Sequence, residues 1–519
     1  MRNQARYALS ASHAHTSMSP LELSVVVAYA ALLVLLSVFG VHRYAMTYLY
    51  YRHKYKLPTP KGRFEALPRV TVQLPIFNEL YVTDRLIDAV AKLDYPRELL
   101  QIQVLDDSTD ETRTIARARV DRLRATGLDI VYVHRVDRTG FKAGALEHGL
   151  TTATGEFVAI FDADFIPDPS FLRRTIHHFS DPGIALVQTR WGHINRSFSA
   201  LTQAQAVFLD GHFMVEHIAR NRAGRFFNFN GTAGIWRRAA IAEGGGWQHD
   251  TITEDLDLSF RTQLRGWRFV YLPEIVTPAE LPVDMNAFKA QQHRWAKGAV
   301  QCALKLLRRV LQADLPRPVK REAVMHLTAN VAYLLMIPLS ILLPITVVVR
   351  VSHGMYEVLF MDLPFFATAT VSVIAFYVVS QREQGMSWWQ SVKYLPLVMA
   401  LGIGLSVNNA RAVVEALMGY ETGFVRTPKL GVERKGDKVA PAARKKYKAA
   451  ATLQPLVELG LAAYMTYGVV YLVQRELYWS VPFLALFQLG FAYVGLVSVY
   501  EGLRGRAVRS ARVLAPAAE

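Results

Sequence analysis

The sequence predicts an α/β domain, with a mostly parallel sheet and flanking helices, joined to an α-helical transmembrane domain of about five spans plus interfacial helices. Three observations predict this fold class. The chain has 519 residues, too many for one ordinary domain. Strand-like and helix-like stretches alternate in a long polar region, which is typical of a parallel sheet covered by helices. Long, nearly uncharged runs before and after that region are typical of membrane spans.

The polar region, residues 69–311, is expected to form one domain. Strands are expected at 69–75, 100–105, 130–133 and 157–161, with helices between them at 82–93, 109–124 and 140–150. In parallel sheets, ligands bind beyond the carboxyl ends of the strands. Three of these strands end in polar groups: Phe77-Asn78-Glu79, Asp106-Asp107-Ser108 and Asp162-Ala163-Asp164. The sequence therefore predicts a ligand site at this edge of the sheet.

The apolar runs predict the membrane topology. Spans are expected at 21–41, 324–349, 358–379, 456–473 and 481–500. The uncharged run at 394–406 is short for a span, so 388–417 is expected to be an interfacial or re-entrant helix. The resulting boundaries are 1–20 (extension), 21–50 (first span), 51–68 (basic linker), 69–311 (polar domain), 312–380 (two spans), 381–418 (interfacial or re-entrant helix), 419–448 (basic loop), 449–503 (two spans) and 504–519 (basic tail).

The charge distribution predicts orientation. The net charge is +16, which a soluble nucleic-acid-binding protein could also carry. Much of this charge lies beside apolar runs, however, at 42–63, 426–448 and 504–512. Such clusters mark the cytosolic side of a membrane, so we expect the N-terminus outside, the polar domain and C-terminus inside, and no nucleic-acid partner. The single cysteine, Cys302, excludes an intramolecular disulfide and suits a cytosolic domain.

The acidic motif at the end of the fourth strand suggests a metal site. Asp162 and Asp164 offer hard oxygen ligands of the kind that Mg²⁺ or Mn²⁺ uses when it carries a diphosphate. The plain alternative is a polar strand end in which Asp164 serves a turn. Asp107 could likewise cap the next helix, Lys142 could be a solvated helix lysine, and Phe77 could pack in the core.

Two later motifs add candidate chemistry. In Thr253-Glu254-Asp255, Asp255 could remove a proton from an attacking hydroxyl, or Thr253 could cap a helix whose positive end attracts both acids. Asp257 and Arg261 have the spacing of a structural pair on one helix face. In Gln291-Gln-His-Arg294-Trp295, the guanidinium can bind phosphate oxygens and the indole can pack on a sugar. The alternative is an amphipathic helix with one buried tryptophan.

In this order, the motifs at 107, 162–164, 253–255 and 291–295 resemble those of the processive, membrane-integrated family 2 glycosyltransferases, which include cellulose, chitin and hyaluronan synthases. The stretches QLPIFNE (73–79), VLDDSTD (104–110), FKAGAL (141–146) and FNGTAG (229–234) look most similar to plant cellulose-synthase-like mannan and glucomannan synthases. The resemblance covers residues 69–311 and implies a GT-A-like fold for that domain.

The resemblance also implies roles for individual residues. Asp255 would be the catalytic base, with Glu254 beside it, and Asp164 with Asp162 would bind the metal. The nucleotide-sugar would be held by Phe77, Glu79, Asp107, Lys142, Asp162, Gln291 and Arg294. The acceptor would be held by Trp295, Phe229, Asn230, Gly231 and Thr232. A gating loop over the nucleotide would contain Phe424, Thr427 and Lys429, although its sequence departs from the cellulose-synthase version and could be a plain basic loop.

The expected function is that of an inverting, metal-dependent, processive synthase. It would transfer sugar from GDP-mannose or UDP-glucose to a growing β-linked, β-1,4 glycan and pass that glycan across the bilayer. The sequence leaves two alternatives open: single transfer to a membrane lipid, and a channel or transporter with a cytosolic regulatory domain, which would leave the ordered acidic motifs unexplained. A bacterial inner membrane is expected from the short N-terminal extension, with periplasmic or outer-membrane export partners left open.

Overall fold

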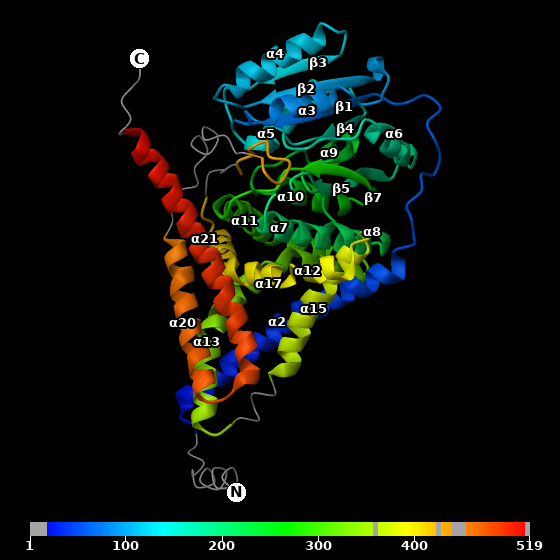
Figure 1. Cartoon of the computed structure of the whole chain (residues 1–519). Coiled ribbons are helices and arrows are strands. Elements are labelled where there is room, and N and C mark those ends of the chain that lie inside the picture. Colours follow the sequence, from blue (N-terminus) through cyan, green and yellow to red (C-terminus); the bar gives the residue numbers. More distant parts are fainter. Residues whose placement is uncertain (1–17, 356–361, 422–426, 438–452, 514–519) are drawn as a thin grey trace.

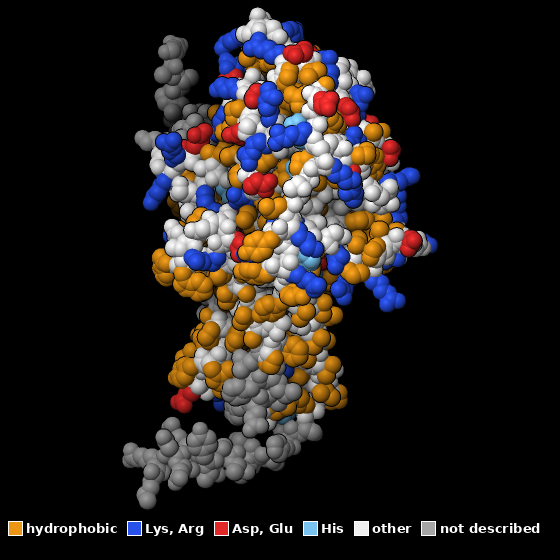
Figure 2. Space-filling view, turned by 90° about the vertical axis from the view of Figure 1, so that its right-hand side faces the viewer, with side chains coloured by type: hydrophobic (Ala, Val, Ile, Leu, Met, Phe, Trp, Pro, Cys, Tyr) orange, Lys and Arg blue, Asp and Glu red, His pale blue; other side chains and the backbone are white. Residues whose placement is uncertain are grey.

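The computed structural model describes residues 18–355, 362–421, 427–437 and 453–513. A sheet domain lies at one end of a bundle of long helices (Figure 1). Figure 2 shows apolar side chains gathered over the bundle, whereas charged side chains gather on the sheet domain. This division matches the two parts that the sequence predicts.

The sheet has seven strands in the order β3-β2-β1-β4-β6-β5-β7. Only β6 runs against its neighbours, so the expectation of a mostly parallel sheet is confirmed. Four strands correspond to the expected ones, and β5, β6 and β7 are additional. Their bounds are β1 Val70–Ile76, β2 Leu100–Asp106, β3 Ile130–His134, β4 Phe157–Ile160, β5 Ile184–His193, β6 Gly234–Arg237 and β7 Arg268–Ala279.

Strand register brings three motifs to one edge. Ile76 pairs with Asp106 across β1 and β2, and Gln73 pairs with Ile160 across β1 and β4. The residues that follow these strands therefore leave the sheet at a similar level. This register places the Phe77, Asp107 and Asp162 motifs beside one another.

Helices cover both faces of the sheet, and each face has its own core. Alternate strand residues point to opposite faces, so Val72 and Leu74 pack with α3 and α4, whereas Val158 and Ile160 pack with α5 and α10. The helices of this domain are α3 Thr83–Val90, η1 Arg97–Leu99, α4 Thr112–Arg124, α5 Phe141–Leu150, α6 Phe171–Thr175, η2 Ile176–Ser180, α7 Ala200–Gly211, η3 His212–Glu216, α8 His217–Arg222, α9 Arg238–Glu243 and α10 Glu254–Gln263.

The bundle contains the long apolar helices. They are α2 Pro20–His53, α13 Val331–Ser352, α15 Leu363–Arg382, α20 Gln454–Gln474 and α21 Val481–Val513, with η4 Tyr478–Ser480 before the last. Their positions agree with the five expected spans, with two qualifications. The second begins at Val331 because residues 324–328 belong to the preceding helix, and the first residues of the third, 358–361, lie outside the described residues. In Figure 1, α2 runs toward the sheet domain and α21 also ends on that side.

Six helical stretches of the described chain are long and apolar enough to cross a membrane, one more than the five expected spans. The additional stretch, Trp388–Leu417, is divided into α16 Trp388–Val392, α17 Leu395–Gly404 and α18 Ser406–Leu417. The longest of these has 12 residues, whereas a span needs about 20. In Figure 1, α17 lies across the direction of the long helices, where the bundle meets the sheet domain. The interfacial or re-entrant placement of this stretch stays a prediction.

Two further helices connect the sheet domain to the bundle. They are α11 Met285–Gln312 and α12 Arg317–Thr328. α11 packs against α10 on one side and against α18 and α21 on the other. The helix that carries the Gln291–Trp295 motif therefore contacts both parts of the protein.

Candidate active site

A cavity opens at the carboxyl edge of the sheet and is closed by α10, α11 and the segment at residues 427–431. It brings together residues that the sequence places more than 300 positions apart. Fifteen of the residues predicted for the site line it: Phe77, Glu79, Asp107, Lys142, Asp162, Asp164, Asn230, Gly231, Glu254, Asp255, Gln291, Arg294, Trp295, Thr427 and Lys429.

The part of the cavity beyond β1 and β2 has an aromatic ring and an acid, each held by an arginine. The Arg138 guanidinium lies 3.3 Å from the centroid of the Phe77 ring. Arg135 donates to both carboxylate oxygens of Asp107, at 2.9 and 2.5 Å. A nucleobase could stack on the Phe77 ring only beside the Arg138 guanidinium or in its place. Both arginines follow β3 and were not among the predicted site residues.

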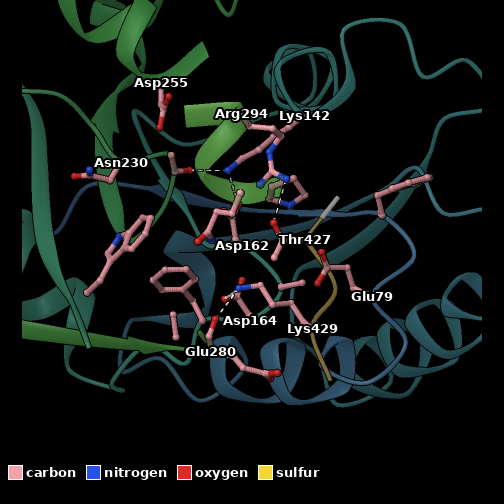
Figure 3. Close-up of a pocket in the computed structure, with 18 of the residues that line it drawn as sticks. Glu79, Lys142, Asp162, Asp164, Asn230, Asp255, Glu280, Arg294, Thr427 and Lys429 are labelled. Carbon is pink, nitrogen blue, oxygen red and sulfur yellow. Dashed lines mark hydrogen bonds and ion pairs between the residues drawn. The ribbon is translucent and has the colours of Figure 1, made fainter. Parts of the chain in front are cut away.

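Lys142 is the central cation of the cavity. Its Nζ donates to Asp162 Oδ1 at 2.5 Å and to the Gly231 carbonyl at 2.9 Å (Figure 3). Burial opposes its charge, but the Asp162 and Glu254 carboxylates outweigh that effect and raise the pKa of Lys142. The ammonium is therefore retained at neutral pH, where it can meet a phosphate.

Asp164 is held by the segment that follows residue 426. Lys429 Nζ donates to Asp164 Oδ2 at 2.7 Å and to the Glu280 carbonyl at 2.6 Å (Figure 3). The Glu280 carboxylate accepts from the backbone N–H groups of Leu430 and Gly431, at 2.8 and 3.1 Å. Glu280 thus fixes this segment against the catalytic domain. It was not predicted, because the strand that ends next to it was not predicted.

The α11 motif lines the opposite wall. Residues 291, 294 and 295 are three and four apart, so they share one helix face. Arg294 Nη1 donates to Thr427 Oγ1 at 3.0 Å, and burial lowers the pKa of Arg294 to about 10, which leaves it cationic at neutral pH. The Trp295 ring centroid lies 6.5 Å from that of Trp191, a second aromatic lining residue that the sequence analysis missed.

The acid pair opens α10. Asp255 Oδ1 accepts from the Leu256 backbone N–H at 2.8 Å. Burial and the neighbouring Glu254 carboxylate raise the pKa of Asp255 to about 7, and burial also raises the pKa of Glu254. An acid that titrates near neutrality can act as a general base there. Thr253 occupies the N-cap position of α10, as the alternative expected, but its side chain makes no capping hydrogen bond and lies 3.4 Å from Cys302 Sγ.

The FNGT stretch is divided by the structure. Asn230 and Gly231 line the cavity, but Phe229 and Thr232 are fully buried behind it. The Phe229 ring packs against Trp236, and Thr232 Oγ1 accepts from the Asp162 backbone N–H at 2.9 Å. Direct acceptor contact is therefore incorrect for these two residues, which support the site from behind. Phe424 lies outside the described residues. Asp257 and Arg261 form the expected pair, with a bond of 2.8 Å.

The fold and cavity define a class of protein: a membrane-associated α/β domain whose site combines cations for a phosphorylated ligand with a carboxyl group that titrates near neutral pH. Residues 68–298 match the family described as "Glycosyltransferase like family 2". A glucomannan 4-beta-mannosyltransferase 7 of Arabidopsis thaliana is 32% identical over 456 residues, which cover 83% of this chain and 77% of the relative. The chain belongs to the family 2 glycosyltransferases, within their cellulose-synthase-like group.

Other similarities cover a smaller share of this chain. A probable glucomannan 4-beta-mannosyltransferase 7 of Oryza sativa subsp. japonica is 42% identical over 300 residues, 55% of this chain and 51% of the relative. The chain thus spans about half the length of that relative. Among solved structures, a mannosyltransferase of Pyrobaculum calidifontis in complex with GDP-Man and Mn²⁺ gives a TM-score of 0.48 at 22% identity, covering 74% of this chain and all of that one.

Proposed function

We propose that the protein is an inverting hexosyltransferase that transfers mannose from GDP-mannose to the end of a growing β-1,4-linked glycan. The observation that carries this proposal is Asp255, an acid with a pKa of about 7, in one cavity with Lys142 and Arg294. The names of the similar relatives, glucomannan 4-beta-mannosyltransferases, favour mannose. UDP-glucose is the second donor to test.

The chain's residues support a single displacement. Lys142 and Arg294 bind and orient the diphosphate of the donor, and their charges stabilise the negative charge that develops as the sugar leaves. Asp255 accepts the proton of the acceptor hydroxyl as its oxygen attacks the anomeric carbon from the opposite face. Trp295 and Trp191 supply apolar faces for the acceptor sugar. Phe77, Glu79 and Asp107 bind the nucleoside, for which Arg135 and Arg138 must be partly displaced.

Asp162 and Asp164 fit a divalent cation, Mg²⁺ or Mn²⁺. Groups of three or more metal-ligating side chains do not occur in the part of the chain that the structure describes. Two carboxylates completed by phosphate oxygens and water are nevertheless a common arrangement for Mg²⁺. Asp164 already binds a cation, the Lys429 ammonium, at 2.7 Å, so this carboxylate is accessible to positive charge. When bound, the metal would neutralise part of the diphosphate charge.

The bundle supports processive transfer and export. A glycan carries many hydroxyl groups, and each would cost several kcal/mol if left unpaired in hydrocarbon. α11 contacts α10 of the sheet domain and α18 and α21 on the bundle side, so a glycan that leaves the cavity between these helices would avoid lipid. The basic residues after α2 favour a cytosolic catalytic domain. The named relatives are plant proteins and give no support to the bacterial inner membrane expected from the sequence.

Incorporation of radiolabelled sugar into ethanol-insoluble product by the purified, detergent-solubilised protein tests the proposal. GDP-mannose, GDP-glucose and UDP-glucose would be compared with Mg²⁺ or Mn²⁺, with Asp255→Asn as the inactive control. We expect the wild type to make polymer from GDP-mannose, and the Asp255→Asn variant to make no polymer from any donor. A labelled lipid without polymer would favour single transfer to a lipid. Uptake of solutes that persists in Asp255→Asn, without any sugar transfer, would favour the transporter alternative.

A further inference from the structure

Behind the cavity, a short π-helix interrupts the chain between α7 and α8. This element, η3, covers residues 212–216 and brings two histidines five positions apart to the same place. In an α-helix such residues lie on different faces, whereas the wider π turn brings them together. The ring centroids of His212 and His217 are 4.2 Å apart. Isolated π turns frequently occur at functional sites.

Both imidazoles hold the side-chain amide of Asn230, a residue that lines the cavity. Asn230 Nδ2 lies 3.0 Å from His212 Nε2, and His217 Nε2 lies 2.6 Å from Asn230 Oδ1. His212 Nδ1 lies 2.9 Å from Glu216 Oε2. Arg220 Nη1 donates to the same Glu216 oxygen at 3.2 Å.

Hydrogen-bond chemistry orders this chain of groups. The Glu216 carboxylate only accepts, so His212 Nδ1 carries a hydrogen, and when the ring is neutral its Nε2 accepts from Asn230. The amide oxygen must then face His217, which donates from Nε2. Burial holds the pKa of His217 well below its ordinary value, and Arg220 and His212 hold the pKa of Glu216 well below its own despite burial. If the Asn230 amide were flipped, its NH₂ group would face the N–H of His217. Its oxygen would face the unprotonated Nε2 of His212, so both hydrogen bonds would be lost.

We propose that His212, His217 and Glu216 are positioning residues, which lock Asn230 so that its second Nδ2 hydrogen points into the cavity and binds a hydroxyl oxygen of the acceptor sugar. The next residue, Gly231, lies against the proposed base: a Cβ added there would be 3.1 Å from Asp255 Oδ2. A hydroxyl group bound to Asn230 would therefore lie close to the group that deprotonates the acceptor.

The same π turn supports the aromatic wall. Phe213 is buried, and its ring centroid lies 5.1 Å from that of Trp191, which in turn lies beside Trp295. One short element thus sets the polar and the apolar contacts expected of an acceptor subsite. This inference rests on the proposed glycosyl transfer and deepens it, because it assigns the orientation of Asn230 to residues outside the recognised motifs.

The test compares Asn230→Asp, His212→Phe and His212→Gln in the full-length protein, with exposed His148→Phe as the matched control. Transfer from GDP-mannose to β-1,4-mannohexaose gives the Michaelis constants for donor and acceptor. Release of GDP without acceptor measures donor hydrolysis. We expect Asn230→Asp and His212→Phe to raise the acceptor KM about tenfold or more, with the donor KM changed less than about twofold. Donor hydrolysis should persist, and His212→Gln, which retains an acceptor oxygen, should recover part of the loss.

Three results would overturn the inference. Equal loss of transfer and hydrolysis in variants that unfold at the wild-type temperature would place the π turn outside acceptor binding. An unchanged acceptor KM in both Asn230→Asp and His212→Phe would also show that the π turn has no role in acceptor binding, and would leave the proposed function intact. A wild type that transfers no sugar would instead overturn the proposed function and this inference together. Nitrogen NMR of labelled histidine adds an independent readout: His212 protonated on Nε2 would contradict the proton assignment.

Discussion

Replacing Asp255 by asparagine should abolish transfer and at the same time stabilise the protein. The pKa of Asp255 rises from 3.8 to about 7 on folding because burial and Glu254 disfavour its charge. The folded protein therefore holds this proton more tightly than the unfolded chain between these two values. This shift costs about 4 kcal/mol of folding free energy at pH 8, where both states are ionised, and about 2 kcal/mol at pH 5, where the folded protein keeps the proton.

The sign follows from the direction of the pKa shift. Stability is lost as pH rises from about 4 to 7 and then stays constant, because above pH 7 both states are ionised. Asparagine carries no charge at any pH, so Asp255→Asn should raise the unfolding temperature by several degrees at pH 8 and by less at pH 5. Thermal unfolding in detergent measures this, with exposed Asp121→Asn as a control that should show no such pH dependence.

The same pKa predicts the pH dependence of the reaction. A general base must be deprotonated, so kcat/KM should fall about tenfold per pH unit below 7 and level off above it. Sugar transfer measured from pH 5 to 9 gives this profile. An inflection below pH 5, or substantial transfer by Asp255→Asn, would refute the assignment of Asp255 as the base. If Asp255→Asn lost transfer but did not unfold at a higher temperature at pH 8, the claim that ionised Asp255 destabilises the folded protein would be refuted.

Three further substitutions test other contacts. Lys429→Met should tighten Mn²⁺ binding measured by titration calorimetry, because the Lys429 ammonium now occupies Asp164; unchanged binding would contradict competition. Lys289 Nζ lies 2.6 Å from Glu458 Oε1, so Lys289→Met leaves this buried carboxylate without its partner. The free energy of unfolding should fall by about 3–5 kcal/mol. A second change, Glu458→Met, should recover most of that loss. Gly231→Ala at φ 81° should reduce transfer strongly, since its methyl group would lie 3.1 Å from the proposed base; near wild-type transfer would contradict this crowding.

The sequence predicts the parallel half of the sheet and the membrane helices because their apolar runs are long and regular. The strands it misses have weaker patterns. β6 has only four residues, and β7 contains two prolines, which an edge strand tolerates but a pattern of alternating residues does not reveal. The division of 388–417 into three helices was only partly foreseen. Its short apolar run predicted an interfacial or re-entrant helix, but nothing in the composition located the breaks.

The site residues were predictable where they follow predicted strands, and less so elsewhere. Asp107 and Asp164 were found because the strand ends fix their place, and Arg135 and Arg138 could have been found by the same rule after β3. Glu280 could not, because its strand was not recognised. His212 and His217 could not be found either, since an α-helical pattern separates residues five apart and only a π turn brings them together.

α11 explains why this active site needs the membrane bundle. Its first backbone N–H, at Met285, donates at 3.0 Å to Glu501 of α21, so an acid suits the positive end of this helix. One turn later, Lys289 pairs with Glu458 of α20, and its carbonyl accepts from Asn408 of α18 at 2.9 Å. The next turn presents Gln291, Arg294 and Trp295 to the cavity. Three bundle helices thus set the axial position of the residues proposed to hold the diphosphate and the acceptor, so a shift of α20 or α21 would displace the diphosphate-binding arginine and the acceptor platform together.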